Sequence, residues 1–475
     1  MKHLFSDHPG DDGVPGSERR FAIAALIVGT LIAVLDGSIV NVALPVIGAT
    51  LHSAAADAVW VANAYLLAGA MSLMAFAALG EVVGFARVYS VGLVVFTLSS
   101  LGCALSDSLP MLVGMRFVQG LGGAAAMSLG PALYRTVVPT RLLGTALGIN
   151  ALVVASATAA GPTLGGFLLE AFSWQWLFAI NVPLGAVAVW LAHRSLPMTR
   201  SGRRHIDLPS VLLSALAMGA LVIGVDDLSH WRQAGGAGHR ALYLLATTLV
   251  CGSLFLARQR RAAAPLLPLQ IFASRRFSMA AATSMCSFTG QGIAFIALPF
   301  LFQGAMGYTA LQSAGLFTPW PLAIVIAAPL AGRLADRMPP ARLSTGGLAV
   351  LALGLGLLAL LPDDAGVADI LWRAFVCGLG FGFFQSPNNR ELMGSAPRTL
   401  SGTASGVLST VRTLGQALGA AMVAILLASL AHHGAGGART GGTLAPHVAL
   451  WIAAGCAAAA TVVSALRIRH AQQSD

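Results

Sequence analysis

Long apolar stretches separated by short polar or charged breaks run along almost the whole chain. Because about 20 apolar residues in a helix cross the hydrocarbon core of a bilayer, each stretch predicts one membrane-spanning helix. We therefore expect an all-α polytopic membrane protein with both chain ends on one side. The breaks predict fourteen spans, at residues 21–45, 58–79, 88–106, 110–134, 143–168, 175–193, 208–225, 241–257, 278–302, 313–332, 343–361, 368–387, 403–430 and 447–466.

The composition supports this class of protein. Hydrophobic residues make up 56% of the 475 positions and charged residues 10%, against roughly 25% charged residues in ordinary soluble domains. The five cysteines lie scattered in apolar stretches, which argues against a disulfide framework or a metal site. The chain has no Walker sequence, no zinc-ligand cluster and no nucleophile beside an obvious base. We expect neither an enzyme nor a bound cofactor or metal.

The basic residues predict the orientation, because Lys and Arg in short loops are retained in the cytoplasm. With the N-terminus inside, 22 of the 28 basic residues are cytoplasmic, three are external (Arg232, Arg240 and Arg439) and three lie within spans (Arg116, Arg373 and Arg412). Residues 1–20 are expected to form a cytoplasmic tail and not a cleaved signal peptide. The net charge of +10 then follows from the topology and from contact with anionic lipid, and it does not require nucleic-acid binding.

An internal repeat predicts the organisation of the spans. The stretch from Gly144 to Gly148 recurs from Gly402 to Gly406, 258 residues later, and Arg116 has a counterpart at nearly the same spacing in Arg373. Two parallel repeats with substrate bound midway between them are a known plan of transporters. We expect a cytoplasmic tail (1–20), an N-terminal six-helix bundle (21–197), two inserted helices (198–265), a C-terminal six-helix bundle (266–466) and a second cytoplasmic tail (467–475).

Asp36 is the carboxylate that the pattern places well inside a span, 16 residues or about 24 Å of helix beyond Arg20. An ionisable group at this depth is costly and is usually functional, which makes Asp36 a candidate proton carrier. A structural role, in which Asp36 bonds to neighbouring helices or caps a break near Gly37, is the alternative.

Two span arginines are candidates for the same site. Arg116 is the basic residue within the first six spans, and it can pair with Asp36 or with cavity carbonyls and Gln119. Arg412 either faces the cavity or lies near a helix end, from which its side chain can snorkel to the interface.

The fifth span has Gly148, Ala157, Gly161, Pro162, Gly165 and Gly166 in a pattern that lets helix backbones approach closely. This run resembles the antiporter motif of drug exporters in the major facilitator superfamily, with Ala157 at a position that usually holds Gly. The stretches Leu35–Pro45 and Ser173–Gly185 resemble the fourteen-helix drug:proton antiporter family in particular. The resemblance implies the major facilitator fold and a location in the bacterial inner membrane, with a periplasmic adaptor and an outer-membrane channel as further partners.

Two loops resemble the gating motif of this family, in which an acid and basic residues latch helices on the cytoplasmic side. Gly332, Asp336 and Arg337 follow the pattern after the tenth span. After the second span, Gly80, Glu81 and Arg87 form a shorter version without the Asp-Arg pair. Either Glu81 and Arg87 replace that pair, or this gate is weaker. Exposed pairs of this kind contribute only about 0 to 1 kcal/mol, so a simple solvated-charge role is the other interpretation.

Polar and aromatic residues of several spans are candidates for a substrate cavity, although some will only bridge helices. The candidates are Asn41, Gln119, Asn150, Gln291, Phe295, Gln385, Asn388 and Arg412.

The sequence as a whole predicts a secondary transporter that exports small amphipathic compounds such as drugs, antibiotics or toxic metabolites. The two halves expose a central cavity alternately to each side, and the proton gradient drives the exchange. One alternative is a dedicated exporter of a metabolite or an amino acid. Another is a membrane receptor or scaffold that transports nothing, although such a protein has no evident use for a buried carboxylate.

Overall fold

The structure, a computed structural model, describes residues 11–197, 207–227, 238–262, 265–335, 337–362, 364–395, 401–431 and 440–472. All regular elements within these ranges are helices. Thirteen of the described helices are long and apolar enough to cross a membrane, judged by length and composition. A further helix of 29 residues, α4 (Leu109–Val137), packs against α2 and α3 but contains Arg116, Gln119 and several glycines. With α4, the described helices account for the fourteen expected spans, and the all-α polytopic class is confirmed.

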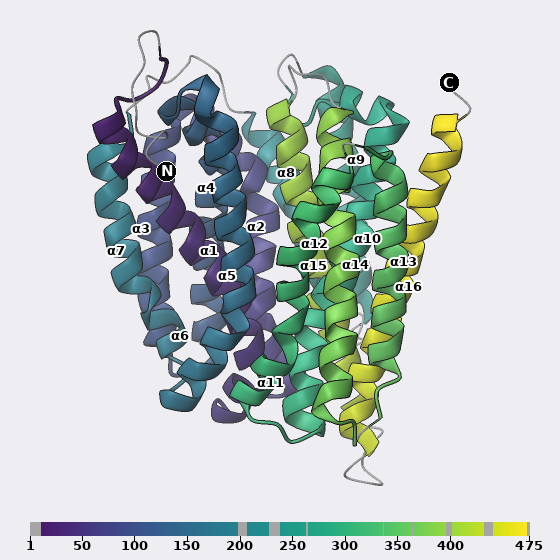
Figure 1. The fold of residues 1–475 in the computed structure, drawn as a ribbon. Helices are drawn as coiled ribbons and strands as arrows, with labels where there is room; N and C mark the ends of the chain where they lie inside the picture. The colour runs from purple at the N-terminus through teal and green to yellow at the C-terminus, as the bar shows by residue number, and fades with distance from the viewer. Residues whose placement is uncertain are drawn as a thin grey trace.

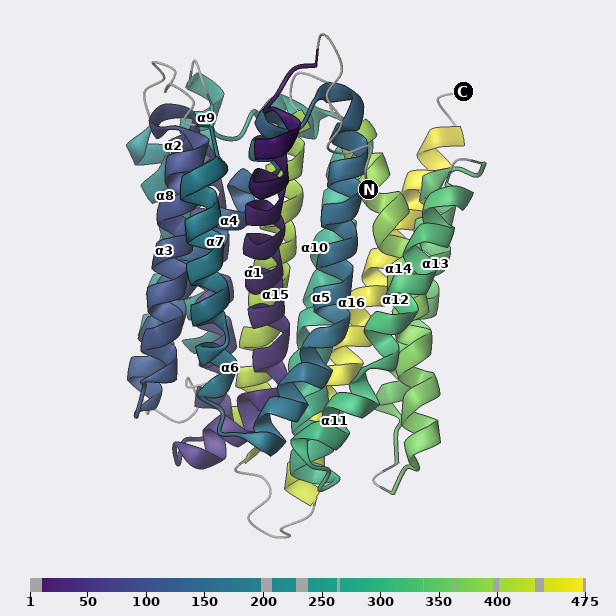
Figure 2. The same cartoon turned by 60° about the vertical axis from the view of Figure 1, so that its left-hand side comes forward.

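The helices form two bundles that stand side by side and run along one direction (Figure 1). The beginning of α1 and the end of α16 lie at the same end of the molecule, as expected (Figures 1 and 2). The first bundle contains α1 (Gly16–Thr50), α2 (Ala55–Val83), α3 (Phe85–Ala104), α4, the 3-10 turn Thr140–Leu142, α5 (Leu143–Ala171), α6 (Trp176–Ala179) and α7 (Asn181–Ser195).

The second bundle repeats the packing of the first. In it α10, α12, α13, α14, α15 and α16 make the main neighbour pairs that α1, α2, α3, α4, α5 and α7 make in the first. Its elements are the 3-10 turn Leu269–Ala273, α10 (Arg275–Pro299), the π-helical turn η5 (Phe300–Ala305), α11 (Ala310–Phe317), α12 (Pro319–Leu334), α13 (Pro340–Ala359), α14 (Val367–Gly394), α15 (Ser401–Ala431) and α16 (Thr440–Gln472).

Glycines at repeated positions explain why the two bundles pack alike. A Cβ at Gly120 would lie 2.5 Å from the carbonyl oxygen of Tyr65, and one at Gly378 would overlap that of Trp320. A Cβ at Gly122 would likewise lie 2.7 Å from the carbonyl oxygen of Gly92 on α3. Gly120 and Gly378 are separated by the repeat spacing of 258 residues, so the same close approach of two helices is encoded in both bundles.

Three of the predicted spans, the sixth, the ninth and the tenth, are interrupted in the structure. The sixth divides at Ile180 into α6 and α7, and the tenth divides at Thr318 into α11 and α12. Proline lacks the amide hydrogen that continues a helix, which explains the division before Pro319 and the π-helical turn that follows Pro299. The divided helices lie at the end of the molecule opposite the chain termini (Figure 2).

The two inserted helices, α8 (Leu208–Asp227) and α9 (Gly238–Arg261), form a hairpin at the seam between the bundles. In this hairpin α8 packs against both α2 and α15. At one end the indole Nε1 of Trp60 donates to Oδ2 of Asp226 at 3.1 Å. At the other end Arg258 donates to Asp207, and this contact holds the pKa of the Asp207 carboxyl below its ordinary value. Polar contacts therefore fix both ends of the hairpin.

The chain ends are more structured than the expected tails. Helix α1 begins at Gly16, and Arg141 pairs with Asp11 at 2.7 Å. Helix α16 continues to Gln472, so Arg467 lies within this helix and not in a tail. Its guanidinium is buried, 3.5 Å from a carboxylate oxygen of Glu391 and 3.0 Å from Oδ1 of Asn388.

Candidate functional site

The carboxylate of Asp36 lies near the middle of α1 and is only 1% exposed. Its Oδ2 accepts from Arg116 Nη1 at 2.5 Å. Its Oδ1 accepts from Gln119 Nε2 at 3.0 Å and from Asn181 Nδ2 at 2.9 Å. Side chains from α4 and α7 thus supply three donors to one carboxylate of α1.

Arg116 is equally buried, and its position one turn before Gln119 in α4 sets the geometry of the cluster. Its Nε donates to the carbonyl oxygen of Val61 at 2.9 Å, and its Nη1 also donates to Gln119 Oε1 at 2.6 Å. The guanidinium lies 4.4 Å from the ring centroid of Tyr65, a distance that permits a cation–π contact. Residues of α2, α4 and α7 therefore hold the ion pair in place, in addition to the attraction between its charges.

Gln119 extends the cluster toward α3. Its Nε2 also donates to Ser100 Oγ at 2.8 Å, and the Sγ of Cys103 lies 3.7 Å from its Oε1. The resulting layer contains one acid and one base in contact within the apolar part of the first bundle. A layer of this kind can change its charge by one unit when Asp36 gains or loses a proton.

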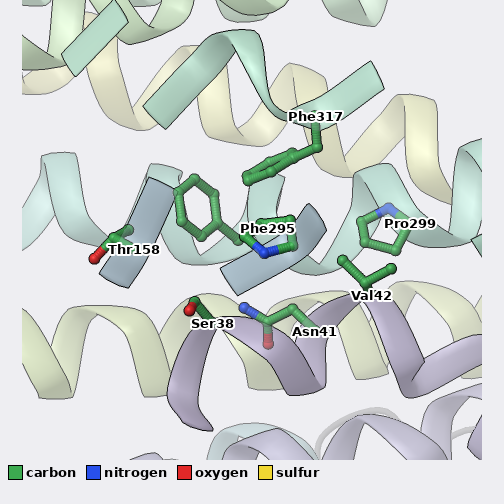
Figure 3. Close-up of a pocket in the computed structure, with 8 residues that line it drawn as sticks. Ser38, Asn41, Val42, Thr158, Phe295, Pro299 and Phe317 are labelled. Carbon is green, nitrogen blue, oxygen red and sulfur yellow. The ribbon is translucent and has the colours of Figure 1, made fainter. Parts of the chain in front are cut away.

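A pocket lies beside this layer, between α1, α5, α10 and α11. Figure 3 shows the rings of Phe295 and Phe317 facing Ser38 and Asn41 across it. Val42, Pro162 and Pro299 supply further apolar lining, and Thr158 adds a hydroxyl. The pocket is nearly closed in this structure, with a cavity volume of about 10 Å³, and its walls are mostly apolar with a few polar groups.

An aromatic cluster stands behind the pocket. Phe295 lies 4.8 Å from Phe317 and 5.5 Å from Trp320 between ring centroids, edge to face in both pairs. The indole Nε1 of Trp320 is buried and has no hydrogen-bond partner among the residues that the structure describes. This cluster belongs to the second bundle, so the pocket has one wall from each half.

The other expected cavity residues lie in different surroundings. Asn150 accepts from the hydroxyl of Tyr134, and Gln385 is half-buried in α14. Asn388 is fully buried and donates to Ser284 at 2.8 Å within the second bundle. Gln291 accepts from Gln416 at 3.3 Å across α10 and α15. Arg412 is half-buried eleven residues after the start of α15, which is not a position near a helix end.

The glycines of the fifth span lie where α5 crosses α1 and α11. A Cβ at Gly161 would overlap Ser38 Oγ, and one at Gly165 would lie 3.2 Å from the carbonyl oxygen of Ile39. Ala157 is buried, and its carbonyl oxygen accepts from Ser38 at 3.5 Å. A Cβ at Gly166 would lie 2.8 Å from Ala314 of the second bundle. Pro162 is buried and lines the pocket, while for Gly148 the structure describes only its helical backbone.

The bundles touch at the end of the molecule opposite the chain termini. The hydroxyls of Thr163 and Thr318 are 2.8 Å apart, and Gln303 Nε2 donates to the carbonyl oxygen of Val42 at 2.8 Å. Together with Gly166 against α11, these contacts join α1 and α5 to the second bundle.

The expected gating loops lie at the other end. Gly80 packs against Phe85 and Leu129, and the side chains of Glu81 and Arg87 are exposed. Gly332 is half-buried and Arg337 is exposed, while Asp336 lies outside the described residues. A latch by these residues stays a prediction.

Two members of the cluster were not singled out from the sequence. Asn181 follows the aromatic stretch Trp174–Phe178, and only its place in the Ser173–Gly185 stretch marks it. Tyr65 is one aromatic residue among many in the spans, and its contact with Arg116 depends on the crossing of α2 and α4.

Comparison with known proteins agrees with this architecture. The family model of the Major Facilitator Superfamily matches residues 26–420. The chain is 45% identical to "Uncharacterized transporter YebQ" of Escherichia coli (strain K12) over 399 residues, which cover 83% of this chain and 86% of that protein. It is 32% identical to the tetracenomycin C resistance and export protein of Streptomyces glaucescens, with 80% and 71% of the chains covered.

A second group of similarities concerns the riboflavin transporter RibZ of Clostridioides difficile (strain 630) and solved structures. RibZ is 29% identical, with 80% of this chain and 82% of RibZ covered. A peptide-complexed POT family transporter superposes with a TM-score of 0.69 at 13% identity, over 95% and 96% of the two chains. The xylose transporter XylE from E. coli gives a TM-score of 0.61 at 12% identity, over 94% and 97%. The likeness to these two structures concerns the fold, and the family match confirms the expected major facilitator fold. The chain belongs to the Major Facilitator Superfamily and is a multi-pass membrane transporter.

Proposed function

We propose that this transporter exports small amphipathic compounds in exchange for protons, by alternating access, in the inner membrane of a bacterium with both termini in the cytoplasm. The observation that carries the proposal is the buried cluster of Asp36, Arg116, Gln119 and Asn181. Such a cluster is costly to build in an apolar bundle, and a proton acceptor explains its presence.

Protonation of Asp36 is the coupling step of this proposal. It removes the negative charge that the Arg116 guanidinium faces and so weakens the contact between α1 and α4. Because α1 also contacts the second bundle through Val42 and Gln303, a change at Asp36 can alter the contacts between the bundles. Each proton that enters down a potential of 100 mV supplies about 2.3 kcal/mol to the exchange.

The contacts between the bundles support alternating access. In the proposed orientation, Thr163, Thr318 and Gly166 lie on the external side and close the passage there. Rocking of one bundle against the other would separate these contacts and expose the pocket to the outside.

Export of drug-like compounds is supported by the pocket, which has apolar and aromatic walls with few polar groups. Among the similar proteins, one is named for the export of tetracenomycin C and one for the transport of riboflavin. A dedicated metabolite exporter is therefore the second candidate. A periplasmic adaptor and an outer-membrane channel remain proposed partners.

The test uses purified protein in liposomes that enclose a pH-sensitive dye. We expect a panel of polycyclic aromatic compounds to include members that induce proton flux when added to these liposomes. Flux with a single metabolite, and with none of the aromatic panel, would favour the second candidate. Transport that proceeds without any proton movement would refute the coupling.

A further inference from the structure

Arg412 on α15 is a span cation that the proposed coupling step does not use. Within the described part of the chain, the Arg412 guanidinium has no ion pair and no hydrogen bond, whereas Arg116 pairs with Asp36 and Arg373 pairs with Asp369. A guanidinium inside a helical bundle that lacks an anion leaves one positive charge there, which a negatively charged ligand can neutralise.

Arg412 lies well away from both ends of α15. The residue lies eleven positions after Ser401, or about 16 Å along the helix, and its side chain is half-buried. The next residue is Thr413, and a Cβ added at Gly69 of α2 would lie 3.2 Å from its side chain. Arg412 is therefore placed at the seam of the two bundles, beside the helix that carries Tyr65.

Among the described residues, no carboxylate oxygen lies within 4.0 Å of the Arg412 guanidinium. Asp36 is the acid in the middle of a span, and its two oxygens already accept from three donors. Asp36 and Arg116 pair with each other, so the positive charge of Arg412 is left over at the seam of the bundles. A substrate with a negative group would remove this excess, and a cationic substrate would add to it.

A path of polar and aromatic groups leads from Arg412 to the pocket. Gln416 follows Arg412 by one helical turn and donates to Gln291 of α10 at 3.3 Å. One turn beyond Gln291 on α10 stands Phe295, which lines the pocket and contacts Trp320. A molecule with an acidic group at one end and fused aromatic rings at the other would match this order of guanidinium, amides and rings.

We propose that Arg412 binds the acidic group of the transported substrate, and that the substrates are small aromatic anions. This inference rests on the proposed export function and names its substrate class. It also suits the energetics of export, since an anion leaving and a proton entering both move charge in the direction that the membrane potential favours.

The test compares two dyes with the same xanthene rings, namely fluorescein, which is anionic at mildly alkaline pH, and a cationic rhodamine. Their binding to purified protein in a neutral detergent is followed by fluorescence anisotropy. We expect fluorescein to bind at least about tenfold more tightly than the rhodamine, because a charge-assisted hydrogen bond is worth about that factor or more. Arg412→Gln should weaken fluorescein binding by a similar factor, and Arg412→Lys should restore much of it.

The control variant is Arg260→Gln, which removes one positive charge from the exposed end of α9 and should bind fluorescein as the unmodified protein does. Equal binding of fluorescein by Arg412→Gln and the unmodified protein would overturn the inference, as would tighter binding of the rhodamine or no binding of fluorescein. An anionic lipid headgroup is the other source of a negative group. Displacement of fluorescein by added anionic phospholipid, but not by neutral phospholipid, would assign Arg412 to lipid and contradict the inference.

The two proposals fail in different measurements. Proton flux driven by the rhodamine and not by fluorescein would refute the anionic substrate class and leave proton-coupled export intact. Binding of fluorescein that depends on Arg412, without proton flux for any compound, would support the site and refute the coupling.

Discussion

At the residue scale, the central cluster holds a carboxylate and a guanidinium in contact among apolar side chains. Asp36 receives three donors, and Arg116 gives hydrogen bonds to Asp36, Gln119 and Val61. Because these bonds replace water around both charges, the pair is satisfied as a unit. Loss of one partner should then cost more than loss of both.

We predict that Arg116→Ala lowers stability strongly, by about 3 to 5 kcal/mol, because it leaves the buried Asp36 without its cation. The double variant Asp36→Asn/Arg116→Gln should unfold at a higher temperature than Arg116→Ala, since no uncompensated charge remains. Thermal unfolding of the purified proteins in detergent measures both. Equal stability of Arg116→Ala and the unmodified protein would show that the pair is not energetically coupled.

The sequence predicted the central pair better than its surroundings. Asp36 and Arg116 stand out because charged residues inside spans are rare, and their pairing was one of two alternatives that the sequence left open. Asn181 and Tyr65 carry no such signal, since amides and aromatic rings occur throughout the spans. The position of Asn388 within the second bundle depends on the crossing of α10, α14 and α16, which no sequence spacing specifies.

At the element scale, apolar length predicted the spans and glycine spacing predicted which helices pack closely. The interruptions at Ile180 and Thr318 were not predicted, because they lie within stretches that remain apolar on both sides of the break. The extension of α16 to Gln472 was missed because Arg467 and Arg469 indicate a cytoplasmic end in the sequence. In this last part of the helix Arg467 forms an ion pair with Glu391 and donates a hydrogen bond to Asn388.

We predict that Gly161→Ala destabilises the protein by about 1 to 3 kcal/mol, because its Cβ would overlap Ser38 Oγ and lie 2.7 Å from Ser38 Cβ. Gly114→Ala is the matched control, since a Cβ there meets nothing within 4 Å. The midpoint of thermal unfolding should fall for the first variant and not for the second. Similar midpoints for the two variants would mean that α5 can move away from α1 at little cost.

A second prediction at this scale concerns the inserted hairpin. Arg258 lowers the pKa of Asp207. The contact therefore stabilises the native protein at pH values above the ordinary pKa of an aspartate, about 4. This contribution to stability is lost as the pH falls below that value. Asp207→Asn should therefore cause a small decrease in unfolding temperature at neutral pH and a smaller one in acid. A decrease that is independent of pH would show that the charge of Asp207 is not responsible.

At the scale of the whole molecule, two bundles of similar packing are joined by contacts at one end and by α2 against α15 at the seam. The repeat was predictable because several features recur at one spacing. The end at which the bundles touch could not be predicted from the sequence, because it depends on the conformational state and not on the fold. Alternating access requires the contacts at this end to open during transport.

We predict that the double variant Thr163→Cys/Thr318→Cys transports in reducing buffer and stops after oxidation, because a disulfide between α5 and the α11–α12 junction would hold the bundles together. The hydroxyl oxygens that the sulfurs would replace are 2.8 Å apart. Each single cysteine variant serves as the control and should keep its activity after oxidation. Undiminished transport by the fully cross-linked protein would show that this end does not open.

The most direct test of the central claim is substrate-induced proton flux in liposomes that contain Asp36→Asn. We predict that this variant folds, binds substrate within a few-fold of the unmodified protein and shows no proton flux, while Glu170→Gln, which alters an exposed acid at the end of α5, keeps its flux. Normal proton flux by correctly folded Asp36→Asn would contradict the account, because the protons would then pass through another group.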